Sequence, residues 1–329
     1  MRREIMSSAF ANMSLLRWKM VWSFAVMLLL LAGTIACSVK ESPETESLLP
    51  PPAKKLYNPP YPNNPVNPFK IIGNVYYLGM TNYTSYLITT PEGHILLDTL
   101  VESMLPTLRE NIAQLGFKLQ DIKIILQAHA HSDHVGALAQ LKELTGAEVL
   151  VMAEDANVLA DGGRSDFRGD GSEIWKPVRA DRTLRDGEEV RLGGVTMVAH
   201  RTAGHTKGCT TWSTVAQEAG NNYNVVFVCS NRVNENIPML DNPKYPNMAE
   251  DFASGFETLK KLPADVFLAS HAFMFNLEDK LKRLQEGSER NPFIDPEGYR
   301  TYVADYEYEF RYRLQQERLA KKPPAPTGY

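Results

Sequence analysis

The run Ile-Lys-Ile-Ile-Leu-Gln at 122–127 leads, through Ala128, into His129-Ala130-His131-Ser132-Asp133-His134. The apolar run predicts a strand that is buried on both faces. The segment after it carries four potential metal ligands within six residues. Imidazole and carboxylate groups suit zinc, and a catalytic zinc takes three protein ligands and keeps one position for water. A polar loop with solvated histidines is the alternative, but this density of ligands at the end of a rigid strand favours a catalytic metal site.

Two more histidines follow predicted strands farther along the chain. His205 lies in Thr202-Ala203-Gly204-His205-Thr206, after a strand predicted over 195–200, and His271 follows a strand predicted over 266–269. Gly204 allows a sharp backbone turn beside the histidine. A lone histidine in either place would more often be structural, but the shared position at strand ends joins both to the first cluster. Six ligands divide naturally between two metal ions.

The other histidines and the cysteines have weaker signals. His94 is expected on the surface of a strand, and His200 is expected to be structural or to support the site. Cys209 and Cys229 lie in apolar, strand-like stretches. They form either one disulfide or two buried thiols.

The rest of the chain predicts one α/β domain. Strands are expected at 74–79, 85–90, 94–98, 148–152, 189–192, 210–215 and 224–229, and helices at 102–115, 134–144, 249–262 and 296–319, with a loop over 161–176. The order is a βαβ-type unit, a β-rich stretch and then mixed helices and strands. Two packed sheets fit that order better than one parallel sheet does.

Composition limits the class of protein and its partners. The chain has 329 residues, a net charge of −4 and 43% hydrophobic residues, which is enough for a sizeable core. Acidic residues slightly outnumber basic ones, and the body of the chain has no basic run. Nucleic-acid binding is therefore disfavoured. No protein partner is inferred.

The N-terminus is typical of an export signal. Arg2, Arg3, Arg17 and Lys19 precede an apolar run over 21–32 that is short for a spanning helix. Leu-Ala-Gly-Thr-Ile-Ala-Cys then ends at Cys37, and is similar to a bacterial lipobox with Thr34 as a departure. Cleavage after Ala36 without lipidation is the alternative. We expect a signal peptide over 1–36, a Pro-rich tether over 37–69, and a periplasmic domain over 70–329 that ends in a long helix, anchored to the outer membrane if Cys37 is lipidated.

The chain resembles the metallo-β-lactamase superfamily and, within it, subclass B three. The resemblance runs from about residue 74 to about residue 312, and the segment at 129–134 marks only the superfamily. The subclass is indicated by Ser85-Tyr86-Leu87-Ile88, Asp98-Thr99, GGRSDF at 162–167, GHTKGCTTW at 204–212, NPKYP at 242–246 and Ser270-His271. The resemblance implies the αββα sandwich of this family, in which two packed mixed β-sheets are flanked by helices.

Carried over position by position, the resemblance implies two zinc ions. It places zinc one on His129, His131 and His205, and zinc two on Asp133, His134 and His271. Asp98 would orient a ligand histidine. Ser230 and Arg232 would bind a substrate carboxylate, with Arg232 in a place where a serine is often found. Leu100 and Ala137 replace usual glycines and Ala203 replaces a usual proline, and these departures bear on substrate fit more than on metal binding.

The implied activity is that of a zinc-dependent β-lactamase acting on penicillins, cephalosporins or carbapenems. Zinc lowers the pKa of bound water to about 7, and two zinc ions about 3.5–4 Å apart can hold the resulting hydroxide and stabilise the leaving group. Asp133 could ligate one metal and orient this nucleophile, so that no protein nucleophile is needed.

Two other functions are alternatives. Glutathione thioesterases and lactonases of the same superfamily carry a metal-bridging Asp at the end of the strand that corresponds to 224–229, whereas this chain has Ser230 there. A serine is a poor bridge between two cations. The third hypothesis is a periplasmic metal-binding or structural protein, against which the intact ligand set argues. Turnover of a chromogenic β-lactam separates that hypothesis from the enzymatic ones.

Overall fold

A computed structural model gives the fold and describes residues 48–53, 56, 62–169, 171, 174–234 and 236–321. The expected signal peptide over 1–36, Cys37, and residues 38–47, 54–55 and 57–61 of the expected tether lie outside the described residues. Within the described ranges, none of the helices combines the length and the apolar character needed to cross a membrane.

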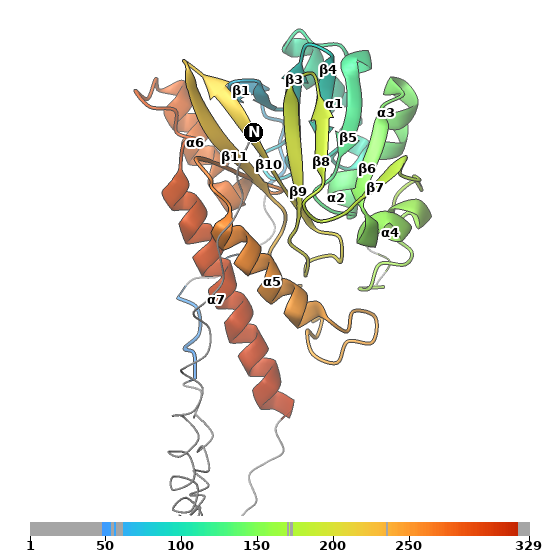
Figure 1. Ribbon diagram of the computed structural model, residues 1–329, viewed down its shortest axis with the longest axis vertical. Helices are drawn as coiled ribbons and strands as arrows, with labels where there is room; N and C mark the ends of the chain where they lie inside the picture. The colour runs from blue at the N-terminus through green and yellow to red at the C-terminus, as the bar shows by residue number, and fades with distance from the viewer. Residues whose placement is uncertain are drawn as a thin grey trace, which may run out of the picture. The chain divides into compact units, whose positions relative to one another are not determined.

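Two mixed β-sheets form the centre of the domain (Figure 1). The seven-stranded sheet follows chain order: β1 (Phe69–Ile72), β2 (Val75–Tyr77), β3 (Tyr86–Thr90), β4 (Gly93–Leu97), β5 (Ile122–Leu126), β6 (Glu148–Met152) and β7 (Arg182–Leu184). The five-stranded sheet has the order β12 (Val266–Ala269), β11 (Asn221–Val228), β10 (Thr210–Glu218), β9 (Val195–Arg201) and β8 (Glu189–Leu192). Strands β4 to β7 are parallel, and so are β11 and β12.

Strand β5 is buried on both faces, as predicted, except at Lys123, which is exposed. Ile124 and Leu126 belong to the core between the sheets, whereas Ile125 belongs to a second core beneath α1 (Leu105–Gln114) and α3 (Leu138–Thr145). Side chains alternate between the faces of a strand, so a strand covered on both sides must be apolar at nearly every position. This confirms the expectation of two packed sheets flanked by helices.

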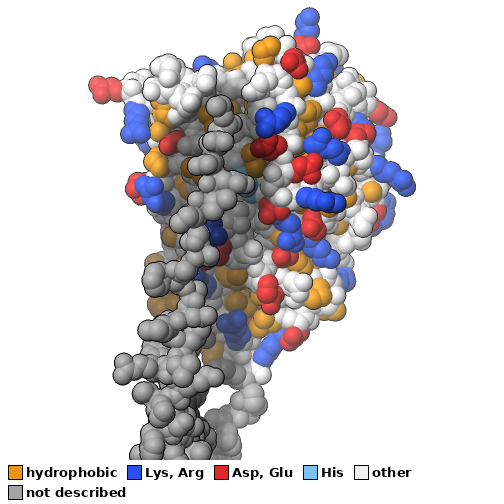
Figure 2. All heavy atoms as spheres, in the orientation of Figure 1, with side chains coloured by type: hydrophobic (Ala, Val, Ile, Leu, Met, Phe, Trp, Pro, Cys, Tyr) orange, Lys and Arg blue, Asp and Glu red, His pale blue; other side chains and the backbone are white. Residues whose placement is uncertain are grey.

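Helices α5 (Met248–Lys261) and α7 (Pro296–Lys321) cover the five-stranded sheet (Figure 1). Phe310 of α7 packs on Phe252 and Phe256 of α5, and Phe267 of β12 packs on Tyr299 and Tyr302 of α7. The shorter helices are α2 (Ser132–Val135), α4 (Ala156–Asp161) and α6 (Leu277–Gln285), with 3₁₀ turns η1 (Glu102–Met104), η2 (Leu119–Asp121), η3 (Ala153–Asp155) and η4 (Ala272–Phe275). On the face in Figure 2, acidic and basic side chains lie interspersed.

The helix predicted over 134–144 is two helices, α2 and α3, and the first begins at Ser132. The cause of the break is a set of contacts with the segment that follows β4. The carbonyl of His134 accepts hydrogen bonds from the backbone N–H and the hydroxyl of Thr99 at 2.7 and 2.9 Å, and Ala137 N–H donates to Leu100 O. The His134 carbonyl and the Ala137 N–H therefore take no part in the hydrogen bonds of a continuous helix. The interruption fastens His134 to the segment that follows β4.

His94 is buried, with 8% of its surface exposed, so the expectation of a surface position was wrong. Strand β4 lies between β3 and β5, and Phe117, which follows α1, packs edge-on against the His94 ring at 5.0 Å. The expectation failed because an alternating pattern shows that two faces exist, but it does not show whether a later segment covers the second face.

Cys209 and Cys229 form a disulfide with 5.9 Å between their Cα atoms, which settles the alternative left open by the sequence. The two cysteines lie at neighbouring ends of the antiparallel pair β10 and β11. Strands β1 and β7 were not predicted, because edge strands of four and three residues are too short to show a period.

Candidate metal centre

The elements that carry the predicted ligands end at one edge of the two sheets. His129 and His131 follow β5, Asp133 and His134 lie in α2, His205 lies in the β9–β10 loop, and His271 follows β12. Backbone hydrogen bonds hold the two sheets together at this edge, from Thr210 to Ala128 O at 2.7 Å and from Ala272 to Asn82 O at 2.8 Å. Tertiary packing thus brings together residues up to 142 positions apart in the chain (129 to 271).

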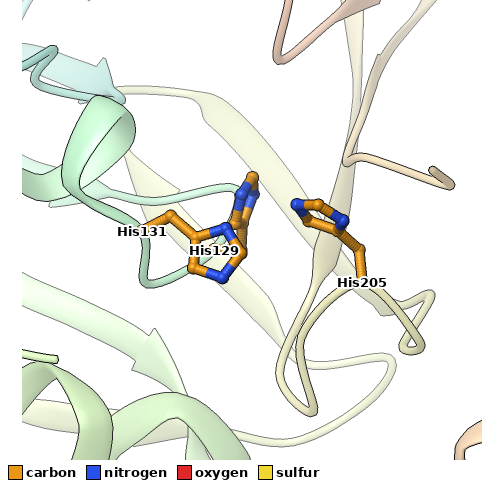
Figure 3. Close-up of side chains that lie close together, drawn as sticks. All are labelled: His129, His131 and His205. Carbon is orange, nitrogen blue, oxygen red and sulfur yellow. The ribbon is translucent and has the colours of Figure 1, made fainter. Parts of the chain in front are cut away.

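The first group of three consists of His129, His131 and His205, whose candidate ligand atoms lie within 4.8 Å of one another. Their rings converge from two loops (Figure 3), with centroids 4.6 to 4.9 Å apart. His205 Nδ1–H donates to the carbonyl of Arg232 at 3.0 Å, which leaves Nε2 as the free nitrogen. His131 Nε2 lies 3.5 Å from Asp166 Oδ2, which leaves Nδ1 to face the group.

The second group consists of Asp133, His134 and His271. Asp133 Oδ2 lies 3.4 Å from His134 Nε2 and 3.5 Å from His271 Nε2. His134 Nδ1–H donates to Asp98 Oδ2 at 2.8 Å, so its Nε2 is directed toward Asp133. The ligand atoms of Asp133 and His134 also lie within 4.8 Å of one from His129, so the two groups adjoin each other.

Buried nitrogen atoms without partners show that these residues fit a bound cation. Among the described residues of the site, His129 Nε2 and His134 Nε2 are buried, face the two ligand groups and have no hydrogen-bond partner. Leaving buried polar atoms unsatisfied is costly unless a ligand completes them. Five imidazoles and one carboxylate are a donor set that zinc favours.

Electrostatics keep most of the imidazoles in the neutral form that binds a metal. Burial lowers the pKa of His129 and His205 well below the usual 6.5, and lowers the pKa of His271 to about 4. Burial alone would lower the pKa of His134 too, but Asp133 and Asp98 raise it to about 10. Although burial raises the pKa of Asp133, His134 and His271 bring it well below its usual range.

Asp98 contacts His134 as the sequence analysis expects. Its Oδ2 accepts from His134, and its Oδ1 accepts from the backbone N–H of Ala128 at 2.7 Å. Asp98 and Leu100 both have left-handed backbone conformations, with φ of 64° and 62°. This explains why glycine suits position 100 in the resembled subclass, and Leu100 adopts the same conformation with its side chain fully buried.

The two residues expected to bind a substrate carboxylate lie beside the first group. Ser230 is buried and its Oγ accepts a hydrogen bond from the backbone N–H of Arg232 at 3.4 Å. Arg232 is half-buried, and its positive charge contributes to the low pKa of both His205 and His271. The hydrogen bond from His205 Nδ1–H to the Arg232 carbonyl places the backbone of Arg232 beside the first group.

Asp166, for which the sequence predicted no role, lies behind His131. Asp166 Oδ1 accepts hydrogen bonds from the backbone N–H and the Nε–H of Arg168 at 2.8 and 3.0 Å. Its position in the GGRSDF segment is the only signal that could have found it. Cys209 and Cys229 lie near His129, but their sulfurs are bonded to each other.

Comparisons with known proteins agree with this geometry. Residues 78–271 match the family described as the metallo-β-lactamase superfamily. The chain is 41% identical to the FEZ-1 metallo-β-lactamase of Legionella gormanii, with a TM-score of 0.77 over 78% of this chain and 99% of that one. It is 35% identical to LRA-12, a class B3 di-zinc metallo-β-lactamase from an Alaskan soil metagenome, with a TM-score of 0.72 over 76% and 95% of the chains.

Curated relatives match over shorter segments. A hydroxyacylglutathione hydrolase of Pseudomonas aeruginosa is 37% identical over 84 residues, which are 26% of this chain and 25% of that protein. The chain spans about a quarter to a third of the length of the first curated relatives that it matches.

Proposed function

Because the chain belongs to the metallo-β-lactamase superfamily and is a hydrolase of the subclass B3 type, we propose that it hydrolyses the β-lactam amide bond of antibiotics with two zinc ions. The observation that carries the proposal is the pair of three-ligand groups at one sheet edge, in a chain that spans 99% of a β-lactamase at 41% identity. Membership of the family does not by itself specify the substrate, because one fold hosts many reactions.

The ligand set fits the two metals that the family implies. His129, His131 and His205 would hold one zinc, and Asp133, His134 and His271 would hold the other. Bound zinc supplies an activated water near neutral pH and a positive field that polarises a carbonyl.

The chain's own residues orient the reacting groups. Asp98 fixes the tautomer of His134, and the Arg232 carbonyl fixes that of His205, so that Nε2 of each ring is presented to the metal. Asp133 uses Oδ2 toward His134 and His271, and its other oxygen would accept a hydrogen bond from the attacking water. The Arg232 guanidinium would hold the substrate carboxylate.

A hydrolysis panel tests the proposal. Purified protein loaded with zinc is assayed against a penicillin, a cephalosporin, a carbapenem, an acyl-homoserine lactone and a glutathione thioester. We expect the highest kcat/KM on at least one β-lactam. A higher kcat/KM on the thioester or the lactone would contradict the proposed substrate but not the hydrolase activity.

The thioesterase is the second candidate because of the local similarity to a hydroxyacylglutathione hydrolase. Ser230 argues against it. It follows β11, at the position where the thioesterases and lactonases carry a bridging carboxylate, and its hydroxyl accepts from Arg232 N–H. The second zinc would instead rely on His134 and His271.

Arg232→Ala is expected to raise KM for β-lactams that carry a free carboxylate, with a smaller effect on kcat. A charged hydrogen bond contributes about 1.5–3 kcal/mol, which corresponds to about a 10- to 100-fold rise in KM. Arg232→Lys keeps the charge but cannot form two parallel hydrogen bonds to a carboxylate. Its KM should therefore lie between that of the wild type and that of Arg232→Ala.

An ester analogue that lacks the carboxylate charge is the control for Arg232→Ala. Its KM should change much less, and the zinc content should stay at the wild-type value. An equal rise in KM for the acid and the ester would show that Arg232 does not bind the substrate carboxylate.

We propose export to the periplasm, with lipidation of Cys37 and anchoring to the outer membrane. The support is the sequence alone: a basic and apolar N-terminus that ends at Cys37, followed by Ser38. Mass spectrometry of the protein from the native host should show an acylated Cys37. A free amino group at Cys37 would indicate a soluble periplasmic enzyme.

A further inference from the structure

A second carboxylate, Asp155, lies buried behind the first group of histidines. It closes the 3₁₀ turn η3 after β6, and only 2% of its surface is exposed. Its Oδ2 accepts hydrogen bonds from the backbone N–H of Ala130 at 3.0 Å and from the hydroxyl of Thr206 at 2.8 Å. Its Oδ1 accepts from the backbone N–H of Gly208 at 2.7 Å.

These donors belong to the two loops that carry the first group of ligands. Ala130 lies between His129 and His131, whereas Thr206 and Gly208 follow His205. The approach to the second loop is close, because a Cβ at Gly208 would lie 2.6 Å from Asp155 Cγ. A single carboxylate therefore joins the loop of one sheet to the loop of the other.

The hydrogen bonds require both side-chain oxygens of residue 155 to act as acceptors. An ionised carboxylate accepts at both atoms, whereas an amide must present N–H on one side. With Asn at 155, the N–H₂ group would face either Ala130 N–H or Gly208 N–H. Burial raises the pKa of Asp155 above its usual value, although the hydrogen bonds from Ala130, Thr206 and Gly208 oppose that rise. Each oxygen faces a backbone N–H, of Ala130 or of Gly208, and a backbone N–H can only donate, so both oxygens act as acceptors in this structure.

We propose that Asp155 is a positioning residue for the first zinc site, because it sets the distance between the His129–His131 loop and the His205 loop. The inference rests on the proposed two-zinc function. It predicts that loss of the carboxylate weakens the zinc held by His129, His131 and His205 more than the zinc held by Asp133, His134 and His271.

The test is a zinc titration of the full-length protein against a chromophoric chelator, which gives two stepwise dissociation constants. Asp155→Asn should raise the dissociation constant of one zinc by about 10- to 100-fold, the range seen when a partner that orients a metal ligand is lost. The other constant should stay within about threefold. A double-mutant cycle assigns the affected site, because Asp155→Asn should have little further effect in a His205→Ala background.

Asp265→Asn is the matched control for a general loss of stability. Asp265 Oδ2 accepts hydrogen bonds from the backbone N–H and the side-chain amide of Asn224, both at 2.8 Å, at the end of β12 opposite His271. The Asp265→Asn variant should lower the melting temperature without changing either zinc dissociation constant. Thr206→Val removes one of the three donors and should raise the same constant as Asp155→Asn by about tenfold or less. This variant carries the test if Asp155→Asn does not fold.

The results distinguish a failure of the two-zinc function from a failure of the positioning role of Asp155. Wild-type protein that binds fewer than two zinc ions would contradict the proposed function itself. Wild-type protein that binds two, together with Asp155 and Thr206 variants that melt earlier but keep both zinc constants, would overturn the positioning role and leave the function standing.

Discussion

Removal of zinc is expected to abolish hydrolysis, and addition of zinc is expected to restore it. The proposed reaction needs water activated near neutral pH, and the residues assigned to the site are ligands and orienting groups rather than nucleophiles. Five of the chain's seven histidines contribute to the ligand set. Elemental analysis of the purified protein should give about two zinc ions per chain.

The measurement compares three preparations of the same protein: as purified, after dialysis against a chelator, and after addition of zinc. Metal binding to the native state also stabilises it, so the chelated protein should melt at a lower temperature. Magnesium addition serves as the control, because magnesium prefers oxygen ligands and should not restore activity. Undiminished turnover in protein shown by elemental analysis to lack metal would refute the metal mechanism.

Asp133→Asn is expected to lower kcat by about 100-fold or more, at the upper end of the loss seen when a metal site is disturbed. Asp133 Oδ2 lies between His134 Nε2 and His271 Nε2, at 3.4 and 3.5 Å. The amide is nearly the same size but carries no charge, so the second zinc loses its anionic ligand and the attacking water loses an acceptor. The fold should persist, because the side chain lies on the short helix α2 at the edge of the sheets.

The readouts for Asp133→Asn are kcat, zinc content and melting temperature. Asp279→Asn is a matched control, since Asp279 lies half-exposed on α6 in an ion pair with Arg283 and touches none of the ligands. It should behave as wild type. If Asp133→Asn retained a normal kcat with two zinc ions bound, the orienting role assigned to Asp133 would be wrong.

The sequence predicted the core of the fold where its local pattern was strong. The run at 122–127 is buried on both faces, and the long helix over 296–319 is present as α7. These elements could be read because burial on both faces and helical length leave marks within a single segment. The break between α2 and α3 left no such mark, since it depends on Thr99 and Leu100, more than thirty residues earlier.

The same contrast holds for the candidate site. The chain itself specified a strand that ends in a dense set of ligands, because His129, His131, Asp133 and His134 are neighbours in sequence. The resemblance added the division into two groups, and the structure places Asp98 on His134 as that resemblance implies. The role of Asp155 was missed, because an isolated aspartate has no pattern that distinguishes a buried acceptor from a solvated charge, and the role of Asp166 was missed although it lies in the GGRSDF segment.

The sequence by itself therefore determined which residue types could bind metal and which strands deliver them, since both are properties of short segments. Only the tertiary structure decided the burial of His94, the pairing of Cys209 with Cys229, and the carboxylate that joins the loops of His129 and His205. Each of these depends on contacts between segments far apart in the chain. Such contacts are selected by the packing of the two sheets as a whole, because a buried acceptor or sulfur finds its partner only after the hydrophobic core has fixed the strand ends in space.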